Sequence, residues 1–203
     1  MAQLLLAVDF MHQRNIIHRD LKLDNILLKS SKQGIYEVRI ADFGLAKQLK
    51  QGEILSHKCG TPSYIAPEIL RYGEYDLKSD IFSLGSIMYN LITGKYLFEA
   101  GQVRDLVRLN KVCNLSHIQD NLWNTSDSCR DLLYQLLKKN PKKRFNAREA
   151  LQHRWFQEDR DALQIGLEIN KLLSVRPNRA YPYCDQPVHD GSQEIKIQYS
   201  SQK

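Results

Sequence analysis

The sequence is poor in the patterns that mark a secreted, metal-bound or disulfide-linked chain. It has only four cysteines in 203 residues, at positions 59, 113, 129 and 184, and no Cys-x-x-Cys pair. Scattered cysteines of this kind are typical of reduced thiols in a cytoplasmic or nuclear protein. Cys113 and His117 lie one helical turn apart, but a structural zinc site needs four ligands, so we do not expect zinc.

Long hydrophobic runs are also lacking. The most apolar stretch, residues 81–92, is interrupted by small and polar residues, which predicts a buried helix of a soluble domain and not a membrane span. The first residues lack the basic segment of a signal peptide, and Asp9 interrupts their apolar run. We therefore expect no membrane partner and a cytoplasmic location, with the nucleus as the alternative.

Charge of one sign does not dominate the chain. Lys and Arg number 29 against 23 Asp and Glu, for a net charge of +6. Basic residues cluster in residues 138–148, but no motif of a nucleic-acid-binding fold accompanies them. We interpret the cluster as a solvated helix face and expect no nucleic-acid partner.

The patterns that are present predict a mainly α-helical chain with a small β-hairpin. Leu4, Val8 and Met11 recur at helical spacing within residues 3–13. Residues 25–29 and 36–41 each predict a short strand on either side of a turn, so the two should pair. Residues 80–93 predict a helix that is apolar nearly all round, with Gly94 as its C-cap, and shorter helices are expected over 131–138 and 148–155.

Two segments have less regular patterns. Residues 44–66 form an irregular, glycine-dotted connection, and one of this length is usually functional. After Phe156, apolar residues at 165, 169, 172 and 173 fit a helix, whereas those at 163, 165, 167 and 169 alternate as in a strand, so both alternatives stay open. We divide the chain into a domain over 1–156 and a polar tail over 157–203, partly helical and then flexible.

Three motifs carry the strongest functional signal. Residues 18–25 read His-Arg-Asp-Leu-Lys-Leu-Asp-Asn, residues 42–44 read Asp-Phe-Gly, and residues 66–68 read Ala-Pro-Glu. In this order they resemble the catalytic loop, the metal-binding motif and the end of the activation segment of the eukaryotic-type serine/threonine protein kinases. The resemblance runs from residue 3 to about residue 156. It implies the helical C-lobe of the two-lobe α+β kinase fold, ATP and Mg²⁺ as cofactors, and Ser and Thr side chains of proteins as substrates.

The resemblance also assigns chemical roles. Asp20 would accept the hydrogen bond and then the proton of the substrate hydroxyl, and Lys22 would place a positive charge on the transferring phosphoryl group. Asn25 and Asp42 would bind Mg²⁺ through oxygen, and Leu27 would lie under the adenine ring. Each of the polar residues, taken alone, is better explained as a turn, cap or surface residue, whereas the ordered set favours the catalytic roles.

Further residues match structural positions of the family. By the resemblance, Thr61 lies near Asp20 and Lys22, which indicates serine/threonine specificity. Glu68 pairs with a buried Arg144, and such a pair is costly to break. Asp80 holds the backbone of the catalytic loop. The structural set is completed by His18, Phe43 and Gly44.

Regulation and substrate preference are predicted by three positions. Arg19 is typical of kinases that an upstream activating kinase switches on, with Ser56 or Thr61 as the phosphate acceptor. His57 stands where relatives often carry a threonine, which counts against such a switch. Asp24 predicts a preference for a basic residue upstream of the target, although Asn90 stands where kinases of that preference often have glutamate.

The small lobe of the family has no counterpart in these residues. The chain contains no Gly-x-Gly, so the glycine-rich phosphate loop is missing, as is the Val-Ala-Ile-Lys strand. One hypothesis is that the chain is the lower half of a kinase and has negligible activity by itself. A second is a non-catalytic binding module, which the intact set of catalytic residues counts against. A third makes the segment after Trp155 autoinhibitory or a docking segment. The docking loop and residues 144–156 look most like the calcium/calmodulin-dependent kinases and their neighbours.

Overall fold

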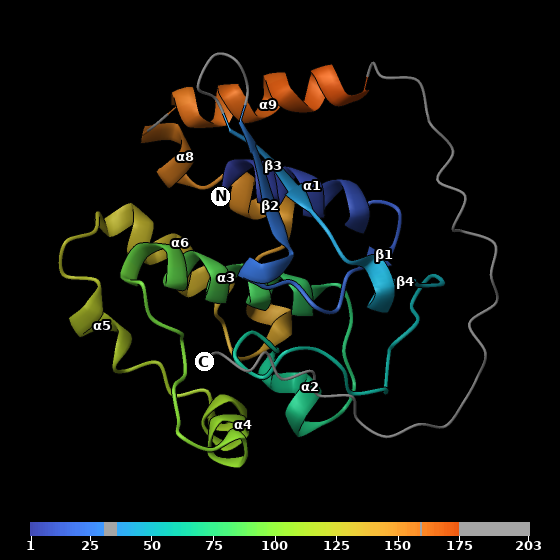
Figure 1. The fold of residues 1–203 in the computed structure, drawn as a ribbon, viewed down its shortest axis with the longest axis vertical. Coiled ribbons are helices and arrows are strands. Elements are labelled where there is room, and N and C mark those ends of the chain that lie inside the picture. Colours follow the sequence, from blue (N-terminus) through green and yellow to red (C-terminus); the bar gives the residue numbers. More distant parts are fainter. Residues whose placement is uncertain (31–35, 159, 175–203) are drawn as a thin grey trace.

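The computed structural model describes residues 1–30, 36–158 and 160–174. Within these ranges the chain is mostly helical, with four short strands (Figure 1). The helices are α1 (Ala2–His12), α2 (Pro67–Arg71), α3 (Lys78–Thr93), α4 (Val103–Val112), α5 (Ile118–Asn121), α6 (Asp127–Leu136), α7 (Ala147–Leu151), α8 (Arg154–Glu158) and α9 (Arg160–Ser174), with single 3₁₀ turns η1 (Leu23–Asn25), η2 (Phe43–Leu45) and η3 (Pro141–Lys143). The strands are β1 (Ile16–Ile17), β2 (Ile26–Ser30), β3 (Tyr36–Ile40) and β4 (Lys47–Gln48).

Helix α3 forms the centre of the hydrophobic core. Its residues from Ser79 to Tyr89 are all buried, which confirms the prediction of a helix that is apolar nearly all round. It begins two residues before the predicted start and ends at Gly94, whose φ of 70° gives the expected left-handed C-cap. A Cβ at Gly85 would lie 2.7 Å from the Leu137 side chain, so only glycine permits this close approach of the segment after α6.

The predicted hairpin is confirmed. Strands β2 and β3 pair antiparallel with Ile26 opposite Ile40. A second ladder was missed by the sequence analysis: β1 pairs antiparallel with β4, Ile16 opposite Gln48. This ladder anchors the chain just after the Asp-Phe-Gly motif to the chain just before the His-Arg-Asp motif. Figure 1 shows the hairpin beside α1, and β1 and β4 near the C-terminal end of that helix.

The prediction of one helix over residues 148–155 was wrong. The chain forms two short helices, α7 and α8, separated at Gln152 and His153. Asn146 and Glu149 make a capping box that starts α7. Helix α6 begins at Asp127, four residues before the predicted start, because the Ser126 side chain caps it by accepting a hydrogen bond from the Cys129 N–H.

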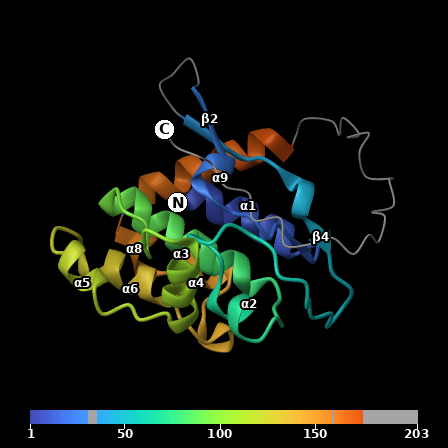
Figure 2. The same cartoon turned by 60° about the horizontal axis from the view of Figure 1, so that its bottom comes forward.

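Of the two alternatives after residue 156, the structure shows a helix. Helix α9 lies along α1 in both views (Figures 1 and 2). At the contact, a Cβ on Gly166 would lie 3.3 Å from Leu6 and 3.5 Å from Ala2, so the two helices approach closely. The flexible tail expected after Arg176 lies outside the described residues.

Candidate active site

The Asp80 carboxylate holds the segment that carries the predicted catalytic loop. Asp80 is 1% exposed near the start of α3. Its Oδ2 accepts the His18 backbone N–H at 2.9 Å and Nε2 of His12 at 3.0 Å, and its Oδ1 accepts the Arg19 N–H at 3.0 Å. These bonds support a left-handed backbone at Arg19, where φ is 71° and a non-glycine residue is strained. The expected contact of Asp80 with this loop is therefore present.

The His18 ring joins the catalytic loop to the Asp-Phe-Gly motif. Its Nε2 donates to the Ala41 carbonyl at 3.0 Å, while its Nδ1 accepts the Asp20 N–H at 3.3 Å. A ring that donates from one nitrogen and accepts at the other is neutral. The Phe43 ring meets His18 edge to face, with centroids 5.0 Å apart. His18 thus sets the spacing between the two motifs.

Three predicted site residues meet around one carboxylate. Oδ1 of Asp20 accepts the Thr61 hydroxyl at 2.7 Å, and its Oδ2 lies 3.0 Å from Nζ of Lys22. The Lys22 ammonium also donates to Oγ1 of Thr61 at 3.3 Å. Asp20, Lys22 and Thr61 therefore form a closed triangle that joins the catalytic loop to the activation segment. All three side chains are buried or half-buried, which strengthens the charge interactions among them.

Two oxygen-bearing side chains lie between Lys22 and Thr61 in the sequence. Nδ2 of the buried Asn25 donates to the Asp20 carbonyl at 2.9 Å, so its Oδ1 is left for another partner. Asp42 is exposed, and one of its carboxylate oxygens accepts the Gly44 N–H at 3.2 Å. The Ala41 N–H donates to the Asn25 carbonyl at 2.8 Å, which ties the two segments together. An amide oxygen and a carboxylate are ligands that suit Mg²⁺.

Arg19 points toward the activation segment. Its Nε donates to the Leu45 carbonyl, and its guanidinium lies near the Tyr75 hydroxyl. Burial raises the pKa of Tyr75 well above its ordinary value, with the Cys59 thiol adding to the shift and Arg19 opposing it. Ser56 is exposed, next to the bridge between Leu55 and Tyr75. Asp24 is exposed in η1.

The Glu68–Arg144 pair is buried and doubly hydrogen-bonded. Nη1 of Arg144 lies 2.7 Å from Oε1 of Glu68, and Nη2 lies 2.9 Å from Oε2. The guanidinium also donates to the carbonyls of Lys78 at 2.7 Å and Lys138 at 2.9 Å. Arg144 is 1% exposed, so it does not belong to the solvated basic face on which its sequence neighbours lie.

Asn110 and Ser83, which the sequence analysis did not single out as site residues, donate hydrogen bonds to the backbone of the activation segment. We call Thr61–Ile65 the docking turn, because both Tyr64 N–H and Ile65 N–H donate to the Thr61 carbonyl at 2.9 Å. Asn110 of α4 donates through Nδ2 to the carbonyls of Pro62 at 2.9 Å and Ile65 at 2.7 Å. Ser83 of α3 donates to the Tyr64 carbonyl at 2.9 Å. For Ser83, a polar residue within the predicted helix over residues 80–93 was the available signal, whereas no helix was predicted around Asn110.

Apolar side chains are exposed next to the site. Leu27 is 53% exposed on β2, and Leu28, Phe43 and Leu45 are exposed as well. Large apolar groups that gather at a surface mark a place where another molecule or segment binds. Leu27 is therefore free to contact a ligand, as its predicted role requires.

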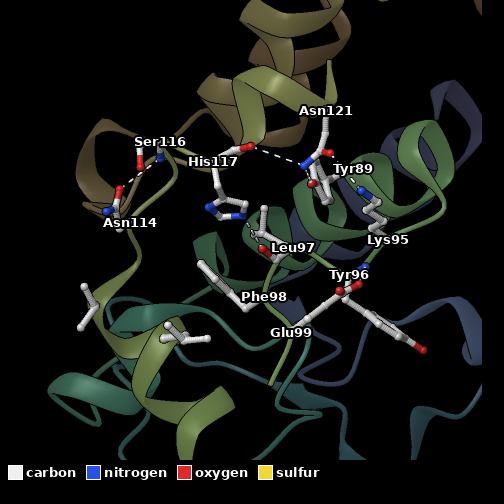
Figure 3. Close-up of a pocket in the computed structure, with 12 residues that line it drawn as sticks. Tyr89, Lys95, Tyr96, Leu97, Phe98, Glu99, Asn114, Ser116, His117 and Asn121 are labelled. Carbon is white, nitrogen blue, oxygen red and sulfur yellow. Dashed lines mark hydrogen bonds between the residues drawn. The ribbon is translucent and has the colours of Figure 1, made fainter. Parts of the chain in front are cut away.

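A surface pocket lies away from this site. It has a volume of about 470 Å³ and is lined by residues of α3, α4, α5 and the connections between them (Figure 3). Its polar groups bond one another: Lys95 donates to Asn121 at 3.1 Å, and Asn121 donates to the Tyr89 hydroxyl at 2.9 Å. These bonds brace α5 against the end of α3, and the pocket contains none of the predicted catalytic residues.

In the part of the chain that the structure describes, no helix is long and apolar enough to cross a membrane. Within the same residues, no three His, Cys, Asp or Glu side chains gather as a metal site. The predicted Mg²⁺ ligands include only one such residue, Asp42, beside the amide of Asn25.

Comparison with known proteins agrees with the geometry. The family model of the protein kinase domain matches residues 1–156. The chain is 34% identical over 172 residues to probable serine/threonine-protein kinase 2 of Plasmodium falciparum, covering 85% of this chain and 33% of that protein. It is 40% identical over 182 residues to a probable myosin light chain kinase of Dictyostelium discoideum (87% and 46%). It is 39% identical over 179 residues to bovine serine/threonine-protein kinase 33 (84% and 34%).

The chain thus spans between a third and a half of the length of these relatives. The family match covers more than half of the chain, and each of these relatives is at least 34% identical. This chain belongs to the eukaryotic-type serine/threonine protein kinase family.

Proposed function

We propose that these residues form the helical lobe of a kinase that transfers the γ-phosphoryl group of ATP to Ser or Thr hydroxyls of proteins. The observation that carries the proposal is the triangle of Asp20, Lys22 and Thr61. Phosphoryl transfer asks the protein for positioning and charge neutralisation and for little covalent chemistry. A carboxylate fixed on both oxygens, with an ammonium 3.0 Å away, suits that task.

Asp20 acts on the substrate hydroxyl. The Thr61 hydroxyl occupies Oδ1, so Oδ2 is the oxygen that accepts the hydrogen bond of an incoming hydroxyl and takes its proton as the oxygen attacks the γ-phosphorus. Lys22, which lies beside Oδ2, places its charge on the transferring phosphoryl group. Transfer breaks the bond between the γ-phosphorus and the bridging oxygen, and ADP leaves with that electron pair.

Oδ1 of Asn25 and the carboxylate of Asp42 would hold Mg²⁺, and Leu27 would contact the adenine. Bound Mg²⁺ neutralises the charge of the ATP phosphates. Because Asn25 Nδ2 donates to the Asp20 carbonyl, Oδ1 is the amide atom that would be available to bind the metal. The exposed Asp42 leaves an oxygen free for it beside the one bonded to Gly44.

The lobe is incomplete for catalysis by itself. The glycine-rich loop and lysine strand that contact ATP from the opposite side in this family are not among these 203 residues. The exposed apolar residues near Leu27 support the same inference, because a second lobe would cover them. We expect negligible activity from the 203 residues alone. An alternative is a non-catalytic binding module that uses this apolar surface.

Four finer expectations remain part of the proposal. Ser56 is exposed and open to phosphorylation by an upstream kinase, and Arg19 of the catalytic loop points toward the activation segment, where it would receive the phosphate. The exposed Asp24 would favour a basic residue upstream of the target. The calcium/calmodulin-dependent group is the subgroup we favour, since two relatives are named as myosin light chain kinases. The scattered cysteines support a cytoplasmic or nuclear location.

The test is a phosphoryl-transfer assay on the longest natural protein that contains these residues. We would use [γ-³²P]ATP, Mg²⁺ and a Ser/Thr peptide library with varied upstream residues. The variant Asp20→Asn should lose about 10³-fold or more in turnover, since the base is lost while the size is kept. The matched control is Asp24→Asn, which should alter peptide preference and leave turnover on a neutral peptide unchanged. A full-length protein that binds partners without transferring phosphate favours the binding module.

A further inference from the structure

Asn110 is the polar residue on the buried stripe of α4. The neighbouring positions of that stripe are Val103, Leu106 and Val107, all apolar and partly buried. Asn110 itself is 0% exposed. A buried amide is unfavourable unless its hydrogen bonds are satisfied. Its presence in an apolar stripe therefore needs an explanation from its partners.

The amide of Asn110 uses its donors on the docking turn alone. Nδ2 donates to the carbonyls of Pro62 at 2.9 Å and Ile65 at 2.7 Å. Its Oδ1 is buried with no hydrogen-bond partner among the described residues. The residue thus leaves a buried acceptor unpaired while it ties two carbonyls of one turn to α4. An apolar residue here would avoid the unpaired oxygen but would lose both ties.

The two carbonyls that accept hydrogen bonds from Asn110 lie in the same turn as Thr61, the residue that contacts the Asp20 carboxylate. The Pro62 carbonyl follows Thr61, and the Ile65 carbonyl ends the turn. The Thr61 carbonyl accepts the two N–H groups that close the turn, and the Thr61 hydroxyl donates to Asp20 at 2.7 Å. A continuous path of hydrogen bonds and one turn therefore runs from α4 to Asp20 and Lys22.

We propose that Asn110 is a positioning residue for phosphoryl transfer, which holds the docking turn where Thr61 contacts Asp20 and Lys22. The proposal rests on the proposed function. Loss of the tie lets the turn shift, and a displacement of about 1 Å at a reacting group can cost about 100-fold in rate. The effect falls on the peptide substrate, since ATP contacts neither the turn nor α4 in the proposed site.

The test compares Asn110→Leu with Asn114→Leu in the longest natural protein that contains these residues. Leucine keeps the branching of asparagine and removes its donors. Asn114 is exposed just after α4, so the control makes the same exchange without touching the turn. For Asn110→Leu we expect kcat/KM for a peptide to fall by about tenfold or more, with KM for ATP changed by less than about twofold. Equal losses in both variants, or no loss in Asn110→Leu, would overturn the proposal.

A second readout needs no activity. Hydrogen–deuterium exchange should become about tenfold faster in the peptide spanning residues 61–66 of Asn110→Leu, because the Tyr64 and Ile65 amides lose their fixed turn. Exchange within α3 should stay at the wild-type rate, which separates a local shift from general unfolding. If exchange in residues 61–66 is unchanged in Asn110→Leu, the hydrogen bonds of Asn110 do not hold the docking turn. If the wild-type protein transfers no phosphate, the proposed function fails, and the exchange result still decides whether Asn110 holds the turn.

Discussion

The buried Glu68–Arg144 pair allows a quantitative prediction. In the variant Arg144→Met, the Glu68 carboxylate, only 3% exposed, becomes a buried charge with no ion-pair partner, which keeps the hydrogen bond from the Ser79 hydroxyl at 3.2 Å, and the carbonyls of Lys78 and Lys138 lose a donor. Breaking such a pair costs about 3–5 kcal/mol in the free energy of unfolding. For a domain of this size we expect Tm to fall by about 6–20 °C.

The assay is urea denaturation at pH 7, followed by circular dichroism and tryptophan fluorescence. The informative control is the double variant Glu68→Leu/Arg144→Met, which removes both charges. We expect it to regain most of the lost stability, because the unpaired charge and not the missing contacts dominates the cost. A loss of less than about 1 kcal/mol in Arg144→Met would mean that the pair behaves as a surface ion pair. A double variant no more stable than the single one would refute the charge argument.

Three other predictions concern residues around the site. Gly60→Ala should lower the free energy of unfolding by about 1–3 kcal/mol, since φ is 115° and the new Cβ would lie 2.9 Å from the Arg19 carbonyl. Its control is Gly52→Ala, which has open space around the new Cβ and should cost less in circular dichroism melts. Asp80→Asn should cost about 1–3 kcal/mol, because an amide N–H would face a donor of the catalytic loop, and circular dichroism melts would show no change if the clamp were unimportant. Burial raises the pKa of Cys113 to about 11, so its stabilising contribution is complete below its ordinary pKa and is lost as pH rises from about 9 to 11. The loss of stability between pH 8 and pH 10.5 should therefore be larger in the wild type than in Cys113→Ala, and an equal loss in both would contradict the prediction.

Local patterns predicted the parts of the fold that local physics decides. Helix α3 and the β2–β3 hairpin follow from hydrophobic periodicity and from the turn between the strands, and both appear within two residues of the predicted bounds. The two-residue strands β1 and β4 have no such signal, since a ladder this short depends on pairs of residues that are 30 and 32 positions apart in the chain. The break between α7 and α8 was missed because the hydrophobic pattern continues across Gln152 and His153.

The candidate site shows the same division. The motifs identified the residues that meet around Asp20, because these lie in short segments with fixed chemistry. Asn110 belongs to no motif, and its partners Pro62 and Ile65 offer backbone carbonyls, which a sequence does not distinguish from any others. Its importance depends on tertiary packing that places α4 beneath the docking turn.

The contact between α9 and α1 separates two meanings of the word domain. The match to the family model ends at residue 156. The packed unit extends further, because Gly166 lets α9 pack closely against Ala2 and Leu6 of α1 at the other end of the described chain. A force on α9, or its removal by truncation, would therefore act first on α1, which leads directly into the catalytic loop. In this molecule the segment that the family model matches and the packed unit have different borders.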